Sequence, residues 1–127
     1  MIILTPEEIV EQHNMIIEST GGSPGLRDEG LLKSAVMGCY QSFGGVDLYP
    51  SIEEKAARMA YAICNNHPFI DGNKRIAVIA MLTVLFMNDI SVSYTQAELI
   101  SLGLGIADGS LDYDSVKSWI NKHKMRI

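Results

Sequence analysis

The chain alternates between stretches with apolar residues at helical spacing and short polar clusters rich in glycine, proline and aspartate. Apolar side chains at positions i, i+3, i+4 and i+7 lie on one face of a helix, so each stretch predicts an amphipathic helix. The polar clusters predict the turns between them. About six such stretches follow one another, which predicts a chain built almost entirely of helices.

Three of the predicted helices begin with a capping box, at Thr5, Ser51 and Thr95. In each, a hydroxyl residue is followed three positions later by glutamate, and both side chains can accept hydrogen bonds from amides of the first turn. The second helix is expected to begin after Asp28 and to keep its apolar face as far as Phe43. The remaining predicted starts are the polar motif described below and Ser110 or Asp112.

One segment, Gly44 to Pro50, interrupts the helical pattern with two glycines and a proline around a short Val/Leu/Tyr run. These residues favour turns, so the segment predicts a movable flap, either a loop or a small hairpin. The fold class that follows is all-α: a compact single domain over residues 1–127, with about six helices and very little strand. A chain of this length can bury its own core.

The overall charge argues against nucleic acid as a direct partner. Ten basic and fifteen acidic residues give a formal net charge of −5, whereas nucleic-acid-binding domains usually carry a basic face. The apolar run from Ile76 to Met87 is too short for a membrane span, which needs about 20 residues. Without a recognisable signal peptide, we expect a cytoplasmic protein in which Cys39 and Cys64 are buried free thiols.

The polar cluster with the most chemistry is HPFIDGNKR, from His67 to Arg75. It directly precedes the apolar run, so it predicts a loop that leads into the N-terminus of a buried helix. Unpaired amides and the helix dipole make such a junction favourable for anions. A histidine side chain can accept a proton from a hydroxyl group, so His67 is a candidate base. Asp71 can reach a hydrated Mg²⁺, and Phe69 is expected to anchor the loop in the core.

The second half of this motif suits phosphate groups. Gly72 permits close backbone approach, Asn73 offers a carbonyl and an amide, and Lys74 and Arg75 supply a point charge and a bidentate fork. A structural interpretation also exists, in which Asp71 or Asn73 caps the helix and the cations are solvated. The concentration of these residue types beside an apolar helix favours a phosphate site with a base.

The motif resembles the signature of the Fic/Doc superfamily. The GGSPGLRD segment, the DLYPSIEEKAA segment and the two C-terminal helices resemble its Doc (death-on-curing) branch over nearly the whole chain. This resemblance implies an all-α Fic fold that uses ATP and Mg²⁺ to modify a protein hydroxyl. His67 would be the general base and Asp71 the metal-binding carboxylate, and the flap would hold the target by backbone hydrogen bonds.

The resemblance also implies roles for the phosphate-binding residues. Gly72 and Asn73 would form the anion nest, and Lys74 and Arg75 would hold phosphates. AMP-transferring members carry HPFxxGNGRxxR, but here Lys74 replaces the second glycine and Val78 the final arginine. Doc-like proteins share the lysine. For them the resemblance implies transfer of the γ-phosphate to a threonine of elongation factor Tu, which blocks translation.

Two other functions remain open at this point: AMP transfer, and a catalytically silent module that binds an antitoxin helix or a peptide. The chain has no clear (S/T)xxxE(G/N) inhibitory helix, so the resemblance implies restraint by a separate antitoxin of the Phd type. Arg27 is expected to have a structural role and His13 to be a buried histidine with its polar atoms satisfied. Asp89 stands where the family usually has glycine, at a small cost in stability.

Overall fold

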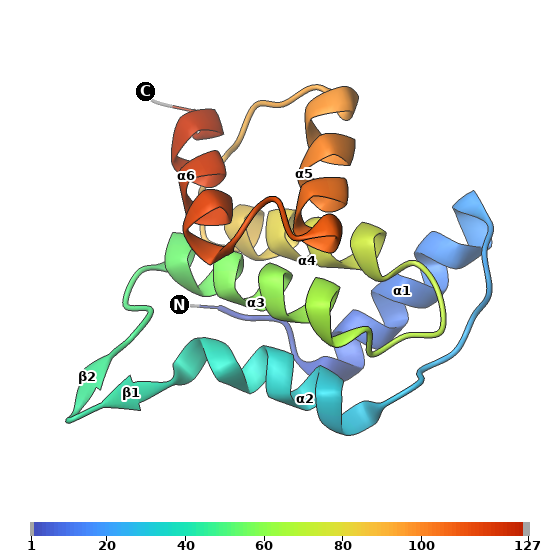
Figure 1. Cartoon of the computed structure of the whole chain (residues 1–127), viewed down its shortest axis with the longest axis horizontal. Helices are drawn as coiled ribbons and strands as arrows, with labels where there is room; N and C mark the ends of the chain where they lie inside the picture. Colours follow the sequence, from blue (N-terminus) through green and yellow to red (C-terminus); the bar gives the residue numbers. More distant parts are fainter. Residues whose placement is uncertain (1, 126–127) are drawn as a thin grey trace.

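The computed structural model describes residues 2–125 as a bundle of helices with one projecting hairpin (Figure 1). The helices are α1 (Pro6–Thr20), α2 (Glu29–Met37), α3 (Ile52–Asn66), α4 (Asn73–Met87), α5 (Gln96–Asp108) and α6 (Tyr113–His123), with a short 3₁₀ turn, η1 (Gly38–Tyr40). Strands β1 (Ser42–Phe43) and β2 (Val46–Asp47) pair antiparallel. The all-α prediction is confirmed.

Local sequence signals determine where most of these helices begin. All three predicted capping boxes form, at Thr5, Ser51 and Thr95. Asp28 caps α2 by accepting a hydrogen bond from the amide of Leu31, and Asp112, rather than Ser110, caps α6 in the same way. A side-chain cap of this kind contributes about 1 kcal/mol.

The predicted extent of the second helix is wrong at its carboxyl end. The helix ends at Met37, and Phe43 lies in β1 with 82% of its surface exposed instead of continuing an apolar face. Gly44 and Gly45 have positive φ angles of 59° and 80°, which only glycine adopts readily. Two such residues form the tight turn of a hairpin, so the chain pairs with itself there.

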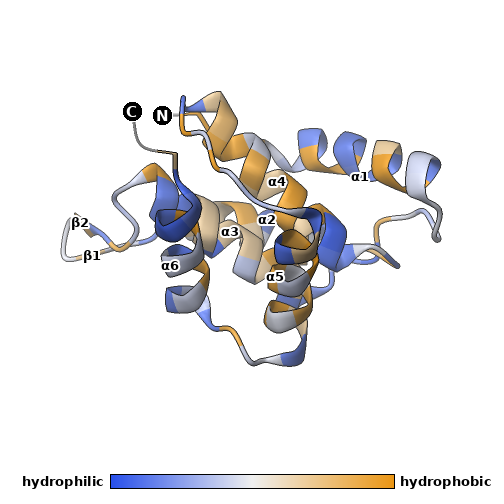
Figure 2. Ribbon diagram, turned by 90° about the horizontal axis from the view of Figure 1, so that it is seen from above, coloured by the Kyte–Doolittle hydropathy of each residue, from blue (hydrophilic) through white to orange (hydrophobic). Residues whose placement is uncertain are grey.

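Helices α3 and α4 form the centre of the bundle. They pack against each other, α2 and α6 pack on α3, and α1 and α5 pack on α4. Figure 2 shows the most apolar ribbon in α4, which is covered by its neighbours. Its residues Ile76, Met81 and Leu85 are fully buried, and each contributes about 1.5–3 kcal/mol by leaving water.

The described residues also bear on the predictions for the two cysteines and for Asp89. Cys39 and Cys64 are buried free thiols, as expected. Burial raises the pKa of both thiols. In residues 2–125, no helix has both the length and the apolar character needed to cross a membrane. Asp89 has a φ of 63°, so the left-handed position expected there is present.

Candidate active site

The motif forms the connection between α3 and α4. His67 directly follows the last residue of α3 and has φ 49° and ψ 55°, the left-handed conformation that costs a non-glycine residue about 1 kcal/mol. Its side chain is exposed. Because the backbone is in an unfavourable conformation, other contacts have to hold the loop in place.

A strap formed by residues 22–28 supplies many of these contacts. The amides of Arg27 and Asp28 donate to the carbonyl of Pro68 at 2.7 and 2.9 Å, and the amide of Ile70 donates to the carbonyl of Gly25 at 3.0 Å. The guanidinium of Arg27 donates from Nε to the carbonyl of His67 (2.7 Å) and from Nη2 to that of Asn66 (2.9 Å). Arg27 therefore has a structural role, since it caps the carboxyl end of α3 beside the histidine.

A second set of contacts, made by Asn73 and His13, fixes the middle of the loop. Phe69 is buried, and Asn73 binds its backbone twice, accepting from the amide at 3.0 Å and donating to the carbonyl at 2.9 Å. The ring of His13 stacks on Phe69 with centroids 3.9 Å apart, and His13 Nε2 donates to the carbonyl of Asp71 at 2.7 Å. The predicted anchoring of the loop by Phe69 is confirmed, whereas the sequence did not assign these contacts to Asn73 and His13.

The expectation for His13 is only half correct. The residue is fully buried, but its Nδ1 has no hydrogen-bond partner among residues 2–125. The carbonyl of Asp71 can only accept a hydrogen bond, so Nε2 of His13 carries a proton and donates it. This bond and the stacking on Phe69 hold the ring of His13 under the loop.

Asp71 is a half-exposed carboxylate with two backbone donors. Oδ2 accepts from the amide of Ser23 at 3.1 Å, Oδ1 accepts from the amide of Gly72 at 2.8 Å, and Arg75 Nη2 lies 3.9 Å away. The hydrogen bonds from Ser23 and Gly72, with the nearby positive charge of Arg75, lower the pKa of the Asp71 carboxyl group. The group is ionised at neutral pH and retains lone pairs that a cation can use.

The N-terminus of α4 differs from the other helix starts. Gly72 is the N-cap residue, with φ 76°, and no side chain caps the helix. Within residues 2–125, nothing accepts a hydrogen bond from the amides of residues 73–75. The structural alternative, in which Asp71 or Asn73 caps this helix, is wrong. Asp71 accepts from the amides of Ser23 and of Gly72 itself, and Asn73 binds the backbone of Phe69, so neither reaches the amides of residues 73–75. These free amides and the helix dipole can bind an anion.

Both glycines nearest this junction are required for its shape. A Cβ atom on Gly72 would lie 3.2 Å from the Ile17 side chain and 3.4 Å from those of Arg75 and His13. A Cβ atom on Gly22, in the strap, would lie 2.7 Å from Asp71 Oδ2. The GGSPGLRD segment was the available sequence signal for the strap, although it was used only for its resemblance to the Doc branch.

The two adjacent cations of the motif have different environments. Arg75 donates from Nη1 to Thr20 Oγ1 (2.6 Å) and to the carbonyl of Gly21 (2.9 Å), so its guanidinium binds the end of α1. Lys74 is exposed and has no hydrogen-bond or ion-pair partner within residues 2–125. Of the two, Lys74 is the one free to receive a ligand.

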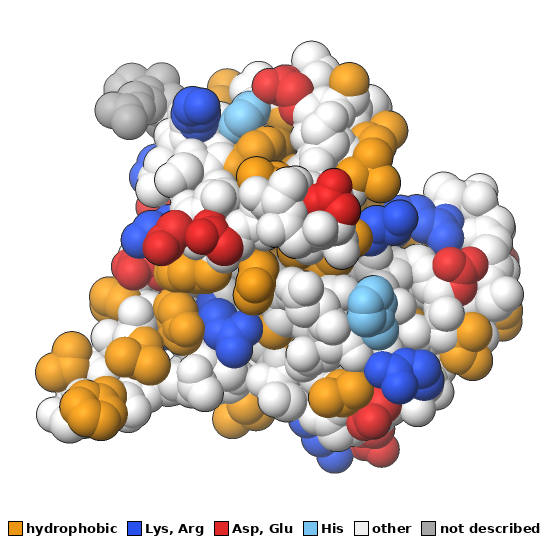
Figure 3. Space-filling view, viewed as in Figure 1, with side chains coloured by type: hydrophobic (Ala, Val, Ile, Leu, Met, Phe, Trp, Pro, Cys, Tyr) orange, Lys and Arg blue, Asp and Glu red, His pale blue; other side chains and the backbone are white. Residues whose placement is uncertain are grey.

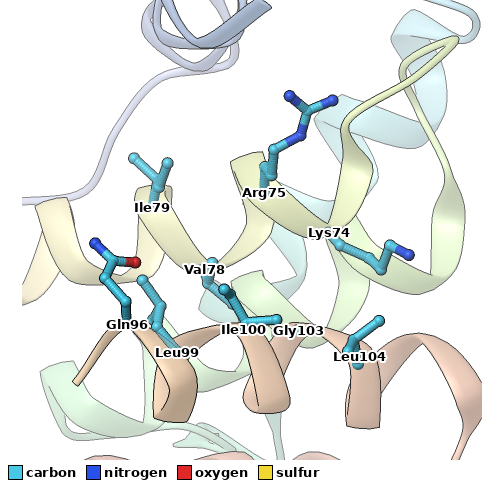
Figure 4. Close-up of a pocket in the computed structure, with 9 residues that line it drawn as sticks. All are labelled: Lys74, Arg75, Val78, Ile79, Gln96, Leu99, Ile100, Gly103 and Leu104. Atoms are coloured by element: carbon cyan, nitrogen blue, oxygen red, sulfur yellow. The ribbon is translucent and has the colours of Figure 1, made fainter. Parts of the chain in front are cut away.

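Lys74 lies at the edge of an apolar cavity between α4 and α5, with a volume of about 400 Å³ (Figure 4). Val78 and Ile79 line it from α4, and Leu99, Ile100 and Leu104 line it from α5. Arg75 points away from α5 (Figure 4), in keeping with its bonds to α1. A cavity of this size can receive a small molecule.

The flap lies at the other end of α3. Residues 41–48 are all exposed, and Figure 3 shows apolar side chains gathered on the projecting hairpin. Phe43 and Val46 are 82% and 68% exposed. Of the two forms predicted for the flap, a loop or a small hairpin, the hairpin is present, and its backbone edges are open to a further strand.

No cluster of three or more histidine, cysteine or acidic side chains lies together in the part of the chain that the structure describes. Asp71 would have to share a metal ion with phosphate oxygens and water. Mg²⁺ is commonly bound in this way, with one or two carboxylates and the phosphates of a nucleotide. The charged, half-exposed carboxylate beside free helix amides fits such a shared ion.

Comparison with known proteins agrees with this geometry. A family model described as the Fic/DOC family matches residues 3–85. The chain is 30% identical over 119 residues to a protein named Protein kinase doc from Escherichia phage P1, covering 94% of this chain and 93% of the relative. It is 40% identical over 73 residues to Toxin Doc of Mycolicibacterium smegmatis, covering 58% of this chain and only 56% of that relative. The chain belongs to the Fic/DOC family, in its Doc branch.

Proposed function

We propose that this protein is a Doc-like toxin that transfers the γ-phosphate of ATP to a protein hydroxyl. The observation that carries the proposal is the open N-terminus of α4, whose free amides follow the exposed His67 in the same short loop. The names of the two relatives, a toxin and a protein kinase, support the same function. A threonine of elongation factor Tu is the proposed target, and translation arrest the proposed outcome.

In the proposed reaction, His67 accepts the proton of the target hydroxyl. The hydroxyl oxygen forms a bond to the γ-phosphorus of ATP, and the bond between the γ-phosphorus and the ADP oxygen breaks. A histidine in this role has to be accessible to a macromolecule, and its side chain is exposed. Its position is determined by Arg27, which binds the carbonyls of residues 66 and 67. A base held in one orientation reacts faster because less motion is lost in the transition state.

The amides at the start of α4 and the Lys74 ammonium bind the phosphates in this proposal. Asp71, which is ionised, would hold Mg²⁺, and this ion would neutralise charge on the phosphate oxygens. Gly72 lets the phosphates approach the backbone. Arg75 contributes through Asp71 and the end of α1, since Nη1 of its guanidinium is bound to Thr20 and Gly21.

Two residues favour phosphate transfer over AMP transfer. Val78 is buried at the wall of the apolar cavity, where AMP-transferring members carry a phosphate-binding arginine. The aliphatic side chain cannot bind phosphate. Lys74 brings a bulky cation to a position where those members have glycine, which crowds the phosphate arrangement needed for AMP transfer. Together they support a nucleotide placed with its γ-phosphate toward His67.

An antitoxin is the proposed partner in the cell. Proteins named as Doc toxins imply such a partner, and we propose that it is Phd-like. The exposed apolar residues Ile100 and Leu104 of α5 border the cavity next to Lys74. A partner helix bound there would obstruct the phosphate site. The cytoplasm is the proposed location, since the proposed target works there.

The proposal can be tested by incubating the purified protein with elongation factor Tu, ATP and Mg²⁺ and then measuring the intact mass of elongation factor Tu. The expected result is one phosphoryl group added to elongation factor Tu. An adenylyl increment would contradict phosphate transfer, and no labelling together with no growth arrest on expression would favour a silent binding module. His67→Ala should abolish labelling and remain folded. His123→Ala is the matched control, because this histidine lies at the end of α6, and it should label normally.

A further inference from the structure

Lys55, in the first turn of α3, is an unusual buried cation. Its residue surface is only 4% exposed, and with fully buried His13 it makes up the buried polar or charged residues of the described chain. Lysine is almost never fully buried unless its charge is compensated, because an ammonium group loses strong hydration when it leaves water. The proposed reaction gives this side chain no role.

The ammonium group of Lys55 binds the chain on both sides of the flap. Nζ donates to the carbonyl of Cys39 at 3.3 Å, before β1, and to the carbonyl of Tyr49, after β2. Asp47 Oδ2, in β2 itself, lies 3.8 Å away. Three oxygens thus face the three N–H donors of one ammonium group. Lys55 therefore closes a loop from residue 39 to residue 49.

The hairpin has little else to hold it. Each strand has two residues, and all residues from 41 to 48 are exposed. A two-stranded hairpin alone is at best marginally stable in water. At its base, the half-buried ring of Tyr49 packs edge-on against Tyr113 with centroids 5.2 Å apart. The direction in which the hairpin projects is thus determined at its base, where Lys55 lies.

We propose that Lys55 is the positioning residue of the flap: by binding Cys39, Tyr49 and Asp47 it holds the hairpin ready to bind a protein substrate. This inference rests on the proposed function only for the substrate step. Lys55 does not take part in phosphate transfer. It raises affinity for the target by ordering the flap before binding, since a preordered segment loses less entropy on association.

Hydrogen–deuterium exchange of the full-length protein tests the anchoring without any substrate. In Lys55→Met, amides of residues 43–48 should exchange at least about tenfold faster than in the wild type, while amides of α4 keep their rates. Lys33→Met is the matched control, since Lys33 is an exposed lysine paired with Glu29 on α2. Flap exchange that is unchanged in Lys55→Met overturns the inference, whether or not the protein proves to be a kinase.

Steady-state kinetics with elongation factor Tu tests the consequence for substrate. Lys55→Met should raise the KM for elongation factor Tu about tenfold and leave kcat and the KM for ATP within about twofold. Lys55→Arg, which keeps the charge and several donors, should recover most of the loss. A fall in kcat with the KM for elongation factor Tu unchanged would overturn the positioning role.

Asp47→Asn provides a second route if Lys55→Met does not fold. The Asp47 side chain is 58% exposed, so its replacement leaves the core intact. Loss of this charged acceptor should raise exchange of the flap amides about twofold to threefold. Exchange rates equal to those of the wild type would overturn the inference by this route as well.

Discussion

Helices α3 and α4 are both fifteen residues long and pack side by side, but they begin in opposite ways. At α3, Ser51 and Glu54 form a capping box that satisfies amides of the first turn. At α4, Gly72 offers no side chain, and the amides of residues 73–75 stay free within the described chain. A helix start closed by its own side chains adds stability, whereas one left open can bind a ligand.

The largest effect should come from disturbing the open helix start. Gly72→Ala forces a Cβ atom between Ile17 and His13 and favours a different backbone conformation. We expect phosphate transfer to fall about a hundredfold because the free amides no longer face the phosphates. Calorimetric titration with ATP and Mg²⁺ should show the matching loss of affinity.

Gly109→Ala is the control for this change. Gly109 has a similar φ of 84°, but a Cβ atom there would meet nothing within 4 Å. Its cost should be backbone strain of about 1 kcal/mol in unfolding free energy, with normal ATP binding. Equal ATP affinity in the two variants would contradict the role assigned to the start of α4.

A smaller effect should follow from releasing the end of α3 beside His67. In Arg27→Met, the carbonyls of residues 66 and 67 lose their donors, so the left-handed histidine is no longer held. We expect kcat to fall about tenfold and the KM for ATP to change little. Arg27→Lys should recover only part of the activity, because an ammonium lacks the fork that reaches both carbonyls. Single-turnover labelling at saturating ATP measures this, and a wild-type rate in Arg27→Met would refute it.

Removal of the side-chain cap at the start of α3 should affect stability alone. Ser51→Ala removes the hydroxyl that accepts from the amide of Glu54 at 3.0 Å. The free energy of unfolding should fall by about 1 kcal/mol, measured in urea, while ATP affinity is retained. A loss of ATP binding in this variant would show that the two helix starts are not as independent as proposed.

The smallest effect should be a pH dependence at the start of α5. Glu98, part of that capping box, also accepts from His123 Nε2 at 2.8 Å. Hydrogen bonding to Glu98 raises the pKa of His123, and the same bond lowers the pKa of Glu98. The pair therefore stabilises the fold below the unfolded pKa of histidine and is lost as pH rises through the raised value. On the acid side it persists until pH falls through the lowered pKa of Glu98.

The melting temperatures of the wild type and His123→Gln provide the measurement. Their difference should be larger at pH 6 than at pH 8.5, since the imidazolium is deprotonated at the higher pH. Salt should reduce the difference, because the pair is partly exposed. A difference that is the same at both pH values would contradict the charged pair.

The helix starts could be predicted from sequence because their signals are local. Thr5, Ser51 and Thr95 each lie three residues from the glutamate that completes the box. The end of α2 was missed because apolar residues continue to Phe43, although the Gly44–Gly45 turn folds them into a hairpin. Spacing alone does not distinguish these two outcomes.

The orientation of the motif side chains depends on distant parts of the chain, so the sequence did not reveal it. Phosphate binding by Arg75 stays a prediction, but Nη1 of its guanidinium already binds Thr20 and Gly21. Asn73 holds the backbone of Phe69 instead of capping α4. The motif alone showed which residues suit the chemistry. Which of them stay free depends on the end of α1, which binds Arg75, and on the backbone of Phe69, which binds Asn73.

The bonds that hold this loop join segments far apart in sequence. His13 and Asp71 are 58 positions apart, and Arg27 and His67 are 40 apart. Contacts at such separation form only after the entropy of closing a long loop has been overcome, so they tend to come late in folding. During synthesis, α1 and the strap can make these contacts only after α3 and the start of α4 have been synthesised. We therefore expect the growing chain to stay inactive until its central helices have emerged, so under the proposed function phosphate transfer would begin only late in synthesis.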